Sequence, residues 1–314
     1  MKKVLFSIIA ITYLFSGCRT SMEEEVIVFH AGSLAVPLNL LADEYEEANP
    51  GTNILLEAAG SLVCARKITE LGKPCDIMAS ADYQIIDAML IPDFAGWNLG
   101  FATNEIVIAY TDRSEAAELI NNDNWTEILR REDIIYGRSD PNADPCGYRT
   151  LLTLKLAEKY YNRPGLQESF SNKDRTFIRP KETDLIALLE TGAVDYIFQY
   201  KSVAVQHSLK YLELPDEINL GNTSFGSEYK SVSVPITGSK PGETLIMNGD
   251  YIMYGITLLD DAPNKEAAIG FLAFIISPRG REVFSRSGQN VISPPVISGI
   301  GAIPEIVRNS IQQQ

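Results

Sequence analysis

Short β-branched runs alternate with helix-like stretches through the first third of the chain. Apolar residues dominate "VIVFH" at 26–30, whereas in the stretch 36–48 apolar Leu38, Leu41 and Tyr45 recur at the spacing of one helix face. The alternation repeats, and the predicted order is strand 26–30, helix 36–48, strand 53–58, helix 62–72, strand 76–81, helix 83–90. Strands that alternate with helices of this length are typical of a wound, mainly parallel sheet.

The pattern changes after a longer predicted strand at 104–111. The later part is predicted to contain helices 125–131, 148–162 and 184–192, a strand entering the loop at 141–149, a strand 194–200, and a Gly-, Ser-, Thr- and Asn-rich stretch 221–249 without helical periodicity. A strand at 251–259 and a helix at 264–288, broken at Pro278, then return to the first pattern.

These elements predict an α/β protein with two lobes. We expect residues 25–108 together with 251–314 to form lobe I, and residues 109–250 to form lobe II as an insertion. The chain would then cross between the lobes twice, which makes a two-segment hinge. A cleft between two such lobes is where ligands usually bind.

The charge of the chain limits its partners. Among 314 residues the formal net charge is −14, and 45% of the residues are hydrophobic. A nucleic-acid partner is excluded by this balance, because a phosphate backbone requires a basic footprint. Any anion that binds here must be held by local dipoles.

Residues 1–18 are typical of a bacterial lipoprotein signal peptide. Lys2 and Lys3 precede the apolar run "VLFSIIAITYLF", which is too short to span a bilayer, and "FSGC" places small residues before Cys18. We expect cleavage before Cys18 and lipidation of its thiol, so that the protein is exported and anchored to a bacterial membrane by lipid alone. An ordinary signal peptide cut nearby is the alternative.

Three further cysteines, Cys64, Cys75 and Cys146, lack the spacing of a metal cluster. Cys64 is expected in the first turn of a helix and Cys75 beyond its far end, so we do not expect them to form a disulfide. Buried thiols are the interpretation we favour.

The phrase Ala-Gly-Ser-Leu occurs twice, each time where a predicted strand leads into a helix. Ser33 and Ser61 stand at these two turns, beside Gly32 and Gly60. The first N–H groups of a helix are unpaired and its dipole is positive there, so an anion is attracted without any lysine. The alternative for each serine alone is a helix N-cap.

A second set of candidates comes from the later part of the chain. Asp144, in the loop "PNADPCGYR", precedes a proline, and Glu182 and Asp184 precede the helix "LIALLETG". Tyr200 ends the strand "YIFQY". The alternatives are a helix cap for Asp144, compensation of a helix dipole for Glu182 and Asp184, and core packing for Tyr200.

Several of these motifs, in order and spacing, resemble one known family. The segments are "VFHAGSL", "EAAGS", "ASADY", "GFATNEIVIAY", "PNADPCGYR", "ETGAVDYIFQYKSVAVQH" and "YGIT". Over about residues 26–300 they are similar to the tungstate/molybdate-binding proteins of ABC importers, of the WtpA type related to ModA.

The resemblance implies a two-lobed, type II periplasmic-binding-protein fold that closes on one oxyanion. It implies that the oxyanion contacts are Gly32, Ser33, Ser61, Asn142, Ala143, Asp144, Glu182 and Tyr200, with Asp144 and Glu182 as ligands of the molybdenum or tungsten centre. Ala143 departs from relatives that carry a second acidic residue there. The implied partners are an ABC permease and its ATPase; we expect a monomer without a cofactor.

Other functions remain as alternatives. The same fold could serve sulfate, phosphate or a carboxylate-bearing solute, although two inward carboxylates have no use in a sulfate site. An enzyme would need a nucleophile and a base, and the histidines are only His30 and His207, with no G-x-S-x-G elbow. We therefore do not expect catalysis. A purely structural lipoprotein would lack a convergent cleft.

Overall fold

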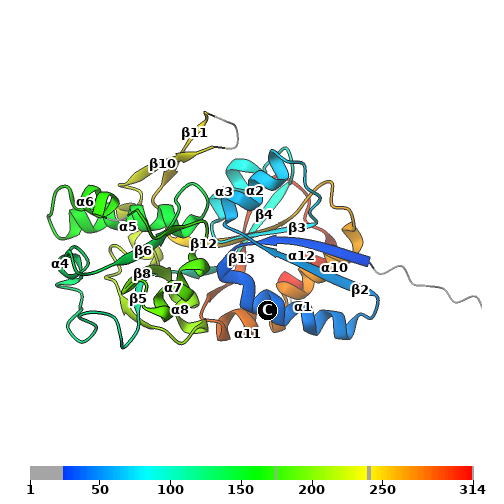
Figure 1. The fold of residues 1–314 in the computed structure, drawn as a ribbon. Helices are drawn as coiled ribbons and strands as arrows, with labels where there is room; N and C mark the ends of the chain where they lie inside the picture. The colour runs from blue at the N-terminus through cyan, green and yellow to red at the C-terminus, as the bar shows by residue number, and fades with distance from the viewer. Residues whose placement is uncertain (1–23, 174, 239–241, 313–314) are drawn as a thin grey trace, which may run out of the picture.

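Two bodies lie side by side in the computed structural model, which describes residues 24–173, 175–238 and 242–312 (Figure 1). One body is built on a six-stranded sheet and the other on a five-stranded sheet. We call them the six-stranded body and the five-stranded body. The predicted signal peptide 1–18 and its Cys18 lie outside the described residues.

The six-stranded sheet has the order β13-β4-β12-β3-β1-β2. Its strands are β1 (Glu24–His30), β2 (Thr52–Ala58), β3 (Ile77–Ser80), β4 (Trp97–Asn104), β12 (Ile252–Leu258) and β13 (Asn290–Gly299). β1 runs parallel to β2 and β3, whereas β12 runs antiparallel to β3 and β4. The return of the chain in β12 therefore fills the centre of this sheet.

Helices cover both faces of this sheet. They are η1 (Gly32–Leu34), α1 (Ala35–Ala48), α2 (Ser61–Thr69), α3 (Tyr83–Met89), α10 (Lys265–Ile275), α11 (Pro278–Arg286) and α12 (Glu305–Gln312). α2 and α3 pack together on one side, and α1 and α10 on the other (Figure 1). Pro278 separates α10 from α11 as expected, and the Ser277 hydroxyl caps α11 by accepting a hydrogen bond from the Gly280 N–H.

The five-stranded sheet has the order β7-β6-β8-β5-β9. Its strands are β5 (Ile106–Tyr110), β6 (Tyr136–Ser139), β7 (Ile178–Arg179), β8 (Tyr196–Tyr200) and β9 (Lys210–Glu213). The helices of this body are α4 (Trp125–Ile128), α5 (Pro145–Tyr160), α6 (Leu166–Lys173), η2 (Glu182–Leu185), α7 (Ile186–Thr191), α8 (Lys201–Gln206), η3 (Thr223–Phe225) and α9 (Gly226–Tyr229). Its aromatic core centres on Trp125. The centroid of its ring lies 5.7 Å from the ring centroid of Phe170 and 6.2 Å from that of Phe198.

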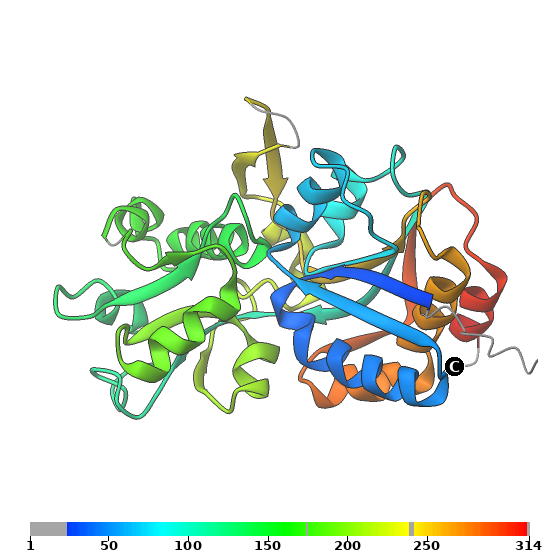
Figure 2. The same cartoon turned by 45° about the vertical axis from the view of Figure 1, so that its right-hand side comes forward.

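A hairpin projects from the molecule where the two bodies meet. Its strands are β10 (Ser233–Thr237) and β11 (Thr244–Asn248), paired antiparallel. Figure 2 shows it in dark yellow beside the cyan helices of the six-stranded body. This hairpin lies within the stretch 221–249, for which the sequence predicted only the absence of helical periodicity.

The predicted alternation of strands and helices is confirmed, with three corrections. The sheets are mixed rather than mainly parallel, because β12, β13, β5 and β9 run against their neighbours. The strands β4, β7, β9, β10, β11 and β13 and the helices α6, α8 and α12 were not predicted, and the short helix α9 lies in the stretch 221–249. β5 belongs to the five-stranded sheet, so the predicted boundary at 108 falls inside this strand. Within the described residues no helix is long and apolar enough to cross a membrane.

Candidate functional site

The two Gly-Ser turns lie side by side at one edge of the six-stranded sheet. β1 ends at His30 and leads through η1 into α1, and β2 ends at Ala58 and leads into α2, which begins at Ser61. Because β1 and β2 are adjacent and parallel, their carboxyl ends share an edge. Both serine side chains are fully buried. The two Gly-Ser turns are therefore neighbours in the fold.

Neither serine hydroxyl caps its own helix. The Tyr254 hydroxyl accepts a hydrogen bond from the Asn104 side chain at 2.7 Å and donates to Ser33 Oγ at 3.0 Å. Ser61 Oγ accepts a hydrogen bond from the Ala81 N–H at 3.0 Å. With an incoming donor on each oxygen, each hydroxyl proton is left to be donated to another group. This arrangement suits the recognition of an anion.

Two carboxyl groups of the five-stranded body lie together near these turns. Asp144 is the residue before α5 and Glu182 opens η2; both are completely buried. Asp144 Oδ2 accepts a hydrogen bond from the Glu182 N–H at 3.1 Å, and the Glu182 carbonyl accepts one from the Gln199 side chain at 3.0 Å. The Asp144 side chain does not cap α5.

Glycines allow the two bodies to approach each other at this point. A methyl group added at Gly32 would lie 2.9 Å from Oε1 of Glu182, and one at Gly60 would lie 2.8 Å from the carbonyl carbon of Ala143. The Val63 N–H also donates to the Ala143 carbonyl at 3.4 Å. The turns of one body are thus in direct contact with the acidic loops of the other, so the cleft is closed.

Several polar atoms in this cluster are buried without a hydrogen-bond partner among the described residues. They are Asp144 Oδ1, both carboxylate oxygens of Glu182, the Tyr200 hydroxyl and the Ser139 hydroxyl. Leaving one such group unsatisfied costs about 1–3 kcal/mol, and several together are rare in a protein interior. The cluster therefore has the character of a site for a polar ligand.

Burial also changes the protonation of the two carboxyl groups. Burial raises the pKa of Asp144 well above its ordinary value, and the nearby charge of Glu182 raises it further. Burial likewise raises the pKa of Glu182. The pair therefore retains a proton to higher pH than free carboxyl groups do. A ligand that binds carboxylates would displace this proton.

Of the remaining predicted residues, Tyr200 lies in the buried cluster, whereas Asn142 and Asp184 lie outside it. Tyr200 is completely buried, and its ring centroid lies 6.1 Å from that of Tyr254, which contacts Ser33. The Asn142 side chain is exposed and accepts hydrogen bonds from Thr237 instead of facing the cluster. Asp184 forms an ion pair with Lys181 at 3.4 Å.

In this turn the His30 ring pairs with the backbone and does not hydrogen-bond to Ser33. Its ring Nδ1 lies 2.8 Å from the Ala31 carbonyl, and burial lowers its pKa. The buried ring is thus paired with the backbone of the loop that follows β1.

Sequence reasoning missed the side chains that hold the site in place. Tyr254 orients Ser33, and the amide nitrogens of Gln289 and Gln206 donate to the Ser33 carbonyl at 3.2 and 3.4 Å. Tyr254 belongs to the segment "YGIT", which contributed to the family resemblance without a role being assigned. Gln206 likewise belongs to the segment "ETGAVDYIFQYKSVAVQH" without a role being assigned, whereas Gln289 carried no local signal.

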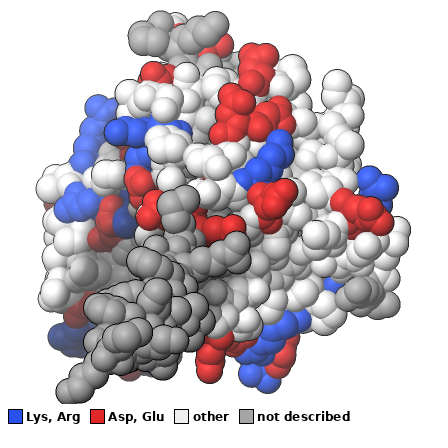
Figure 3. Space-filling model, turned by 90° about the vertical axis from the view of Figure 1, so that its right-hand side faces the viewer, with Lys and Arg blue, Asp and Glu red and all other residues white. Residues whose placement is uncertain are grey.

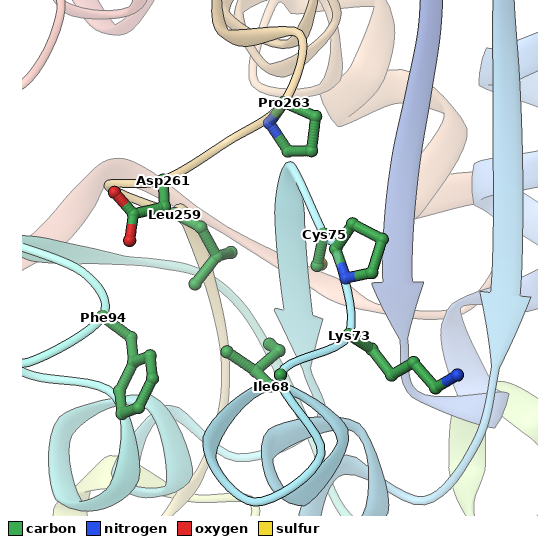
Figure 4. Close-up of a pocket in the computed structure, with 9 residues that line it drawn as sticks. Ile68, Lys73, Cys75, Phe94, Leu259, Asp261 and Pro263 are labelled. Carbon is green, nitrogen blue, oxygen red and sulfur yellow. The ribbon is translucent and has the colours of Figure 1, made fainter.

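A pocket elsewhere in the six-stranded body lacks these features. Ile68, Phe94, Leu259 and Pro263 line it beside Cys75, and Lys73 extends away from it (Figure 4). Cys75 precedes β3, so this pocket lies at the opposite end of the parallel strands from Ser33 and Ser61. Figure 3 shows acidic and basic side chains interspersed on the described part of this end of the molecule, without a continuous basic surface.

Comparisons with known proteins show the family to which the chain belongs. A family model described as bacterial extracellular solute-binding protein matches residues 26–289. An uncharacterized solute-binding protein of Petrotoga mobilis is 46% identical over 289 residues, covering 92% of this chain and 90% of that one. The molybdate/tungstate-binding protein WtpA of Pyrococcus abyssi is 44% identical over 338 residues, covering 97% and 96%.

Solved structures show the same fold at low sequence identity. A periplasmic molybdate-binding protein of Azotobacter vinelandii matches with a TM-score of 0.63 at 16% identity, covering 84% of this chain and 98% of that one. The sulfate-binding protein SubI of Mycobacterium tuberculosis matches with a TM-score of 0.60 at 12% identity, covering 92% and 91%. The expected fold class is confirmed, as is the family resemblance, and solute-binding proteins are not enzymes. The chain belongs to the bacterial extracellular solute-binding proteins.

Proposed function

We propose that this protein captures molybdate or tungstate in the cleft between its two bodies and delivers it to an ABC transporter. The observation that carries the proposal is the buried cluster of Ser33, Asp144, Glu182 and Tyr200, with Ser61 at the adjoining turn. Hydroxyl donors come from one body and carboxyl groups from the other. The name of the Pyrococcus abyssi relative supports this choice of ligand.

The two carboxyl groups favour a metal oxyanion over sulfate. A carboxylate beside a dianion is repelled when it meets only oxygen lone pairs, and burial strengthens that repulsion. Molybdenum(VI) and tungsten(VI) accept additional oxygen ligands, so Asp144 and Glu182 would coordinate the metal centre. Sulfur in sulfate does not expand its shell in this way. The pair thus serves to reject the abundant anion.

Binding also requires the two bodies to separate and close again. Ser33, Ser61, Asp144, Glu182 and Tyr200 each have an exposed fraction of 0%. An oxyanion therefore has no route to them unless the bodies part at the two crossings near Asn104–Ile106 and before Ile252. We propose these crossings as the hinge between the two predicted lobes.

The finer expectations about location and partners belong to the same proposal. Lipidation of Cys18 would hold the protein on the outer side of a bacterial membrane, where a permease and its ATPase receive the oxyanion. We propose that it acts as a monomer. Mass spectrometry of the membrane-bound protein would test the lipid, because an unmodified Cys18 or a different N-terminus would contradict this part.

Calorimetric titration with tungstate, molybdate, sulfate and phosphate tests the ligand. We expect tight binding of the two metal oxyanions, and at least tenfold weaker tungstate binding in Asp144→Asn and Glu182→Gln, because each removes a charged ligand of the metal. Asp184→Asn is the matched control, since Asp184 pairs with Lys181 outside the cluster. Preferential binding of sulfate or phosphate, or wild-type tungstate affinity in both site variants, would contradict the proposal.

A further inference from the structure

One arginine of the six-stranded body contacts both the acidic loop and the hairpin across the closed cleft. Arg66 lies on α2, the helix that begins with Ser61. Its Nη1 donates to the Asn142 carbonyl at 2.6 Å, Nη2 donates to the Thr237 carbonyl at 2.6 Å, and Nε donates to the Gly238 carbonyl at 3.3 Å. All three acceptors are backbone oxygens outside the six-stranded sheet.

The acceptors of Arg66 are themselves joined to the five-stranded body. Asn142 Oδ1 accepts hydrogen bonds from the Thr237 N–H at 2.9 Å and the Thr237 hydroxyl at 3.1 Å. At the base of the hairpin, the Lys155 side chain on α5 donates to the Ser233 carbonyl at 2.6 Å. The hairpin, α5 and the loop before Asp144 therefore form one connected unit. Arg66 donates hydrogen bonds to this unit from the other side of the cleft.

Roles of Arg66 within its own helix account for only part of this geometry. A basic residue in the last turn of α2 compensates the helix dipole, and Arg66 also lies 3.6 Å from Glu70 one turn later. Exposed pairs of this kind contribute little. Neither role requires the planar guanidinium to direct three N–H groups at carbonyls of the other unit, a geometry that lysine does not reproduce.

We propose that Arg66 is a positioning residue that keeps the closed cleft shut and so sets how long the oxyanion stays bound. This inference rests on the proposed oxyanion binding, and it concerns release rather than recognition. The three hydrogen bonds that Arg66 donates go to Asn142, Thr237 and Gly238 and to none of the ligand-binding side chains. Its removal should leave the ligand contacts intact while shortening the lifetime of the closed state.

The effect is expected in the dissociation rate. An oxyanion meets the open protein, in which Arg66 is separated from Asn142 and Thr237, so the rate of encounter does not depend on these bonds. Release requires the closed state to open, and these bonds must break first. Most differences in affinity between related complexes likewise lie in the dissociation rate.

An isotope-chase measurement tests this inference on the full-length protein. Wild type and variants are loaded with labelled tungstate and mixed with excess unlabelled tungstate, and the label retained on rapid filtration gives the dissociation rate. For Arg66→Ala we expect dissociation about 10- to 150-fold faster, the range for loss of one hydrogen bond to a charged group. Association should stay within about twofold, and Arg66→Lys should be intermediate because one donor and the charge remain.

Arg286→Ala is the matched control. Arg286 is an exposed arginine on α11, and its ion pair with Glu282 lies within that helix. Tungstate should therefore dissociate from Arg286→Ala at the wild-type rate. Thermal melting without tungstate should be unchanged in Arg66→Ala, since the bonds of Arg66 form only when the cleft is closed. If wild-type protein retains the label and Arg66→Ala releases it no faster, the proposed role of Arg66 is wrong and the proposed function stands. If wild-type protein retains no label, both the proposed function and the proposed role of Arg66 are wrong.

Discussion

Gly60→Ala should block closure of the cleft without disturbing either body. Gly60 has φ −60° and ψ 140°, a conformation that alanine adopts readily. The added methyl would nevertheless lie 2.8 Å from the carbonyl carbon of Ala143 and 3.0 Å from the carbonyl oxygen of Pro180. Both obstacles are backbone atoms of the five-stranded body. The clash therefore exists only when the two bodies meet.

The size of the clash sets the expected loss of affinity. Carbon atoms in ordinary contact are about 3.5–4.0 Å apart, so the Ala143 loop must retreat by roughly 1 Å. A hydrogen bond or metal–oxygen contact stretched by that amount is no longer formed. Loss of one charged contact corresponds to about 1.5–3 kcal/mol, or roughly a 10- to 150-fold weaker affinity for tungstate.

Calorimetric titration and small-angle scattering test this prediction together. Gly60→Ala should bind tungstate more weakly and should fail to contract when tungstate is added, while its melting temperature without tungstate stays unchanged. Gly226→Ala is the matched control, because a methyl at Gly226 meets nothing within 4 Å. Wild-type affinity and contraction in Gly60→Ala would refute the idea that the cleft closes against this glycine.

Three further predictions concern the hydroxyls, the buried carboxyls and the thiols. Ser33→Ala and Ser61→Ala should each weaken tungstate binding by about 1–3 kcal/mol in titrations, and unchanged affinity in both would remove the serines from the site. Because folding raises the pKa values of Asp144 and Glu182, the ligand-free fold binds more protons than the unfolded chain. Its melting temperature should therefore fall as the pH rises from about 4 through the raised pKa values, and it should fall less in Glu182→Gln. An equally steep fall of the melting temperature with pH in both proteins would contradict the raised pKa values. Burial raises the pKa of Cys64 to about 12, so native protein at pH 8 should resist thiol alkylation, as read by peptide mass spectrometry, at all three described cysteines, Cys64, Cys75 and Cys146.

The elements with regular periodicity were predictable from the sequence, and two of the missed strands, β4 and β13, show why others were not. β4, with the sequence "WNLGFATN", mixes polar residues and glycine into a strand that is almost wholly buried. Its Asn98 is accommodated because the side chain donates to the Tyr83 carbonyl at 3.1 Å and to Asp87 at 2.9 Å. β13 contains two prolines and is an edge strand with a register shift between Val291 and Val296. Tertiary contacts decide both cases.

The candidate site divides in the same way. Ser33, Ser61, Asp144 and Glu182 could be proposed because each stands where a strand enters a helix, which is a local signal. Tyr254 is 221 positions from Ser33, and Thr237 is 171 positions from Arg66. Nothing in the sequence near either residue indicates such a partner. The side chains that orient the site and hold it closed become visible only when the two bodies are placed together.

Closure and selectivity follow from the same two carboxyl groups. In the closed cleft Asp144 and Glu182 are fully buried with oxygens that lack partners, so closing without a suitable ligand is opposed by desolvation and by their mutual repulsion. A ligand whose central atom accepts carboxylate oxygens removes both penalties, and closure then gains the contacts of Arg66. Sulfate would satisfy the serine hydroxyls alone and leave the carboxyl groups unpaired, so it would hold the protein open even when it reaches the turns. Under the proposed function, the protein therefore discriminates between anions chiefly by which of them allows it to close, and only the closed form would be recognised as loaded.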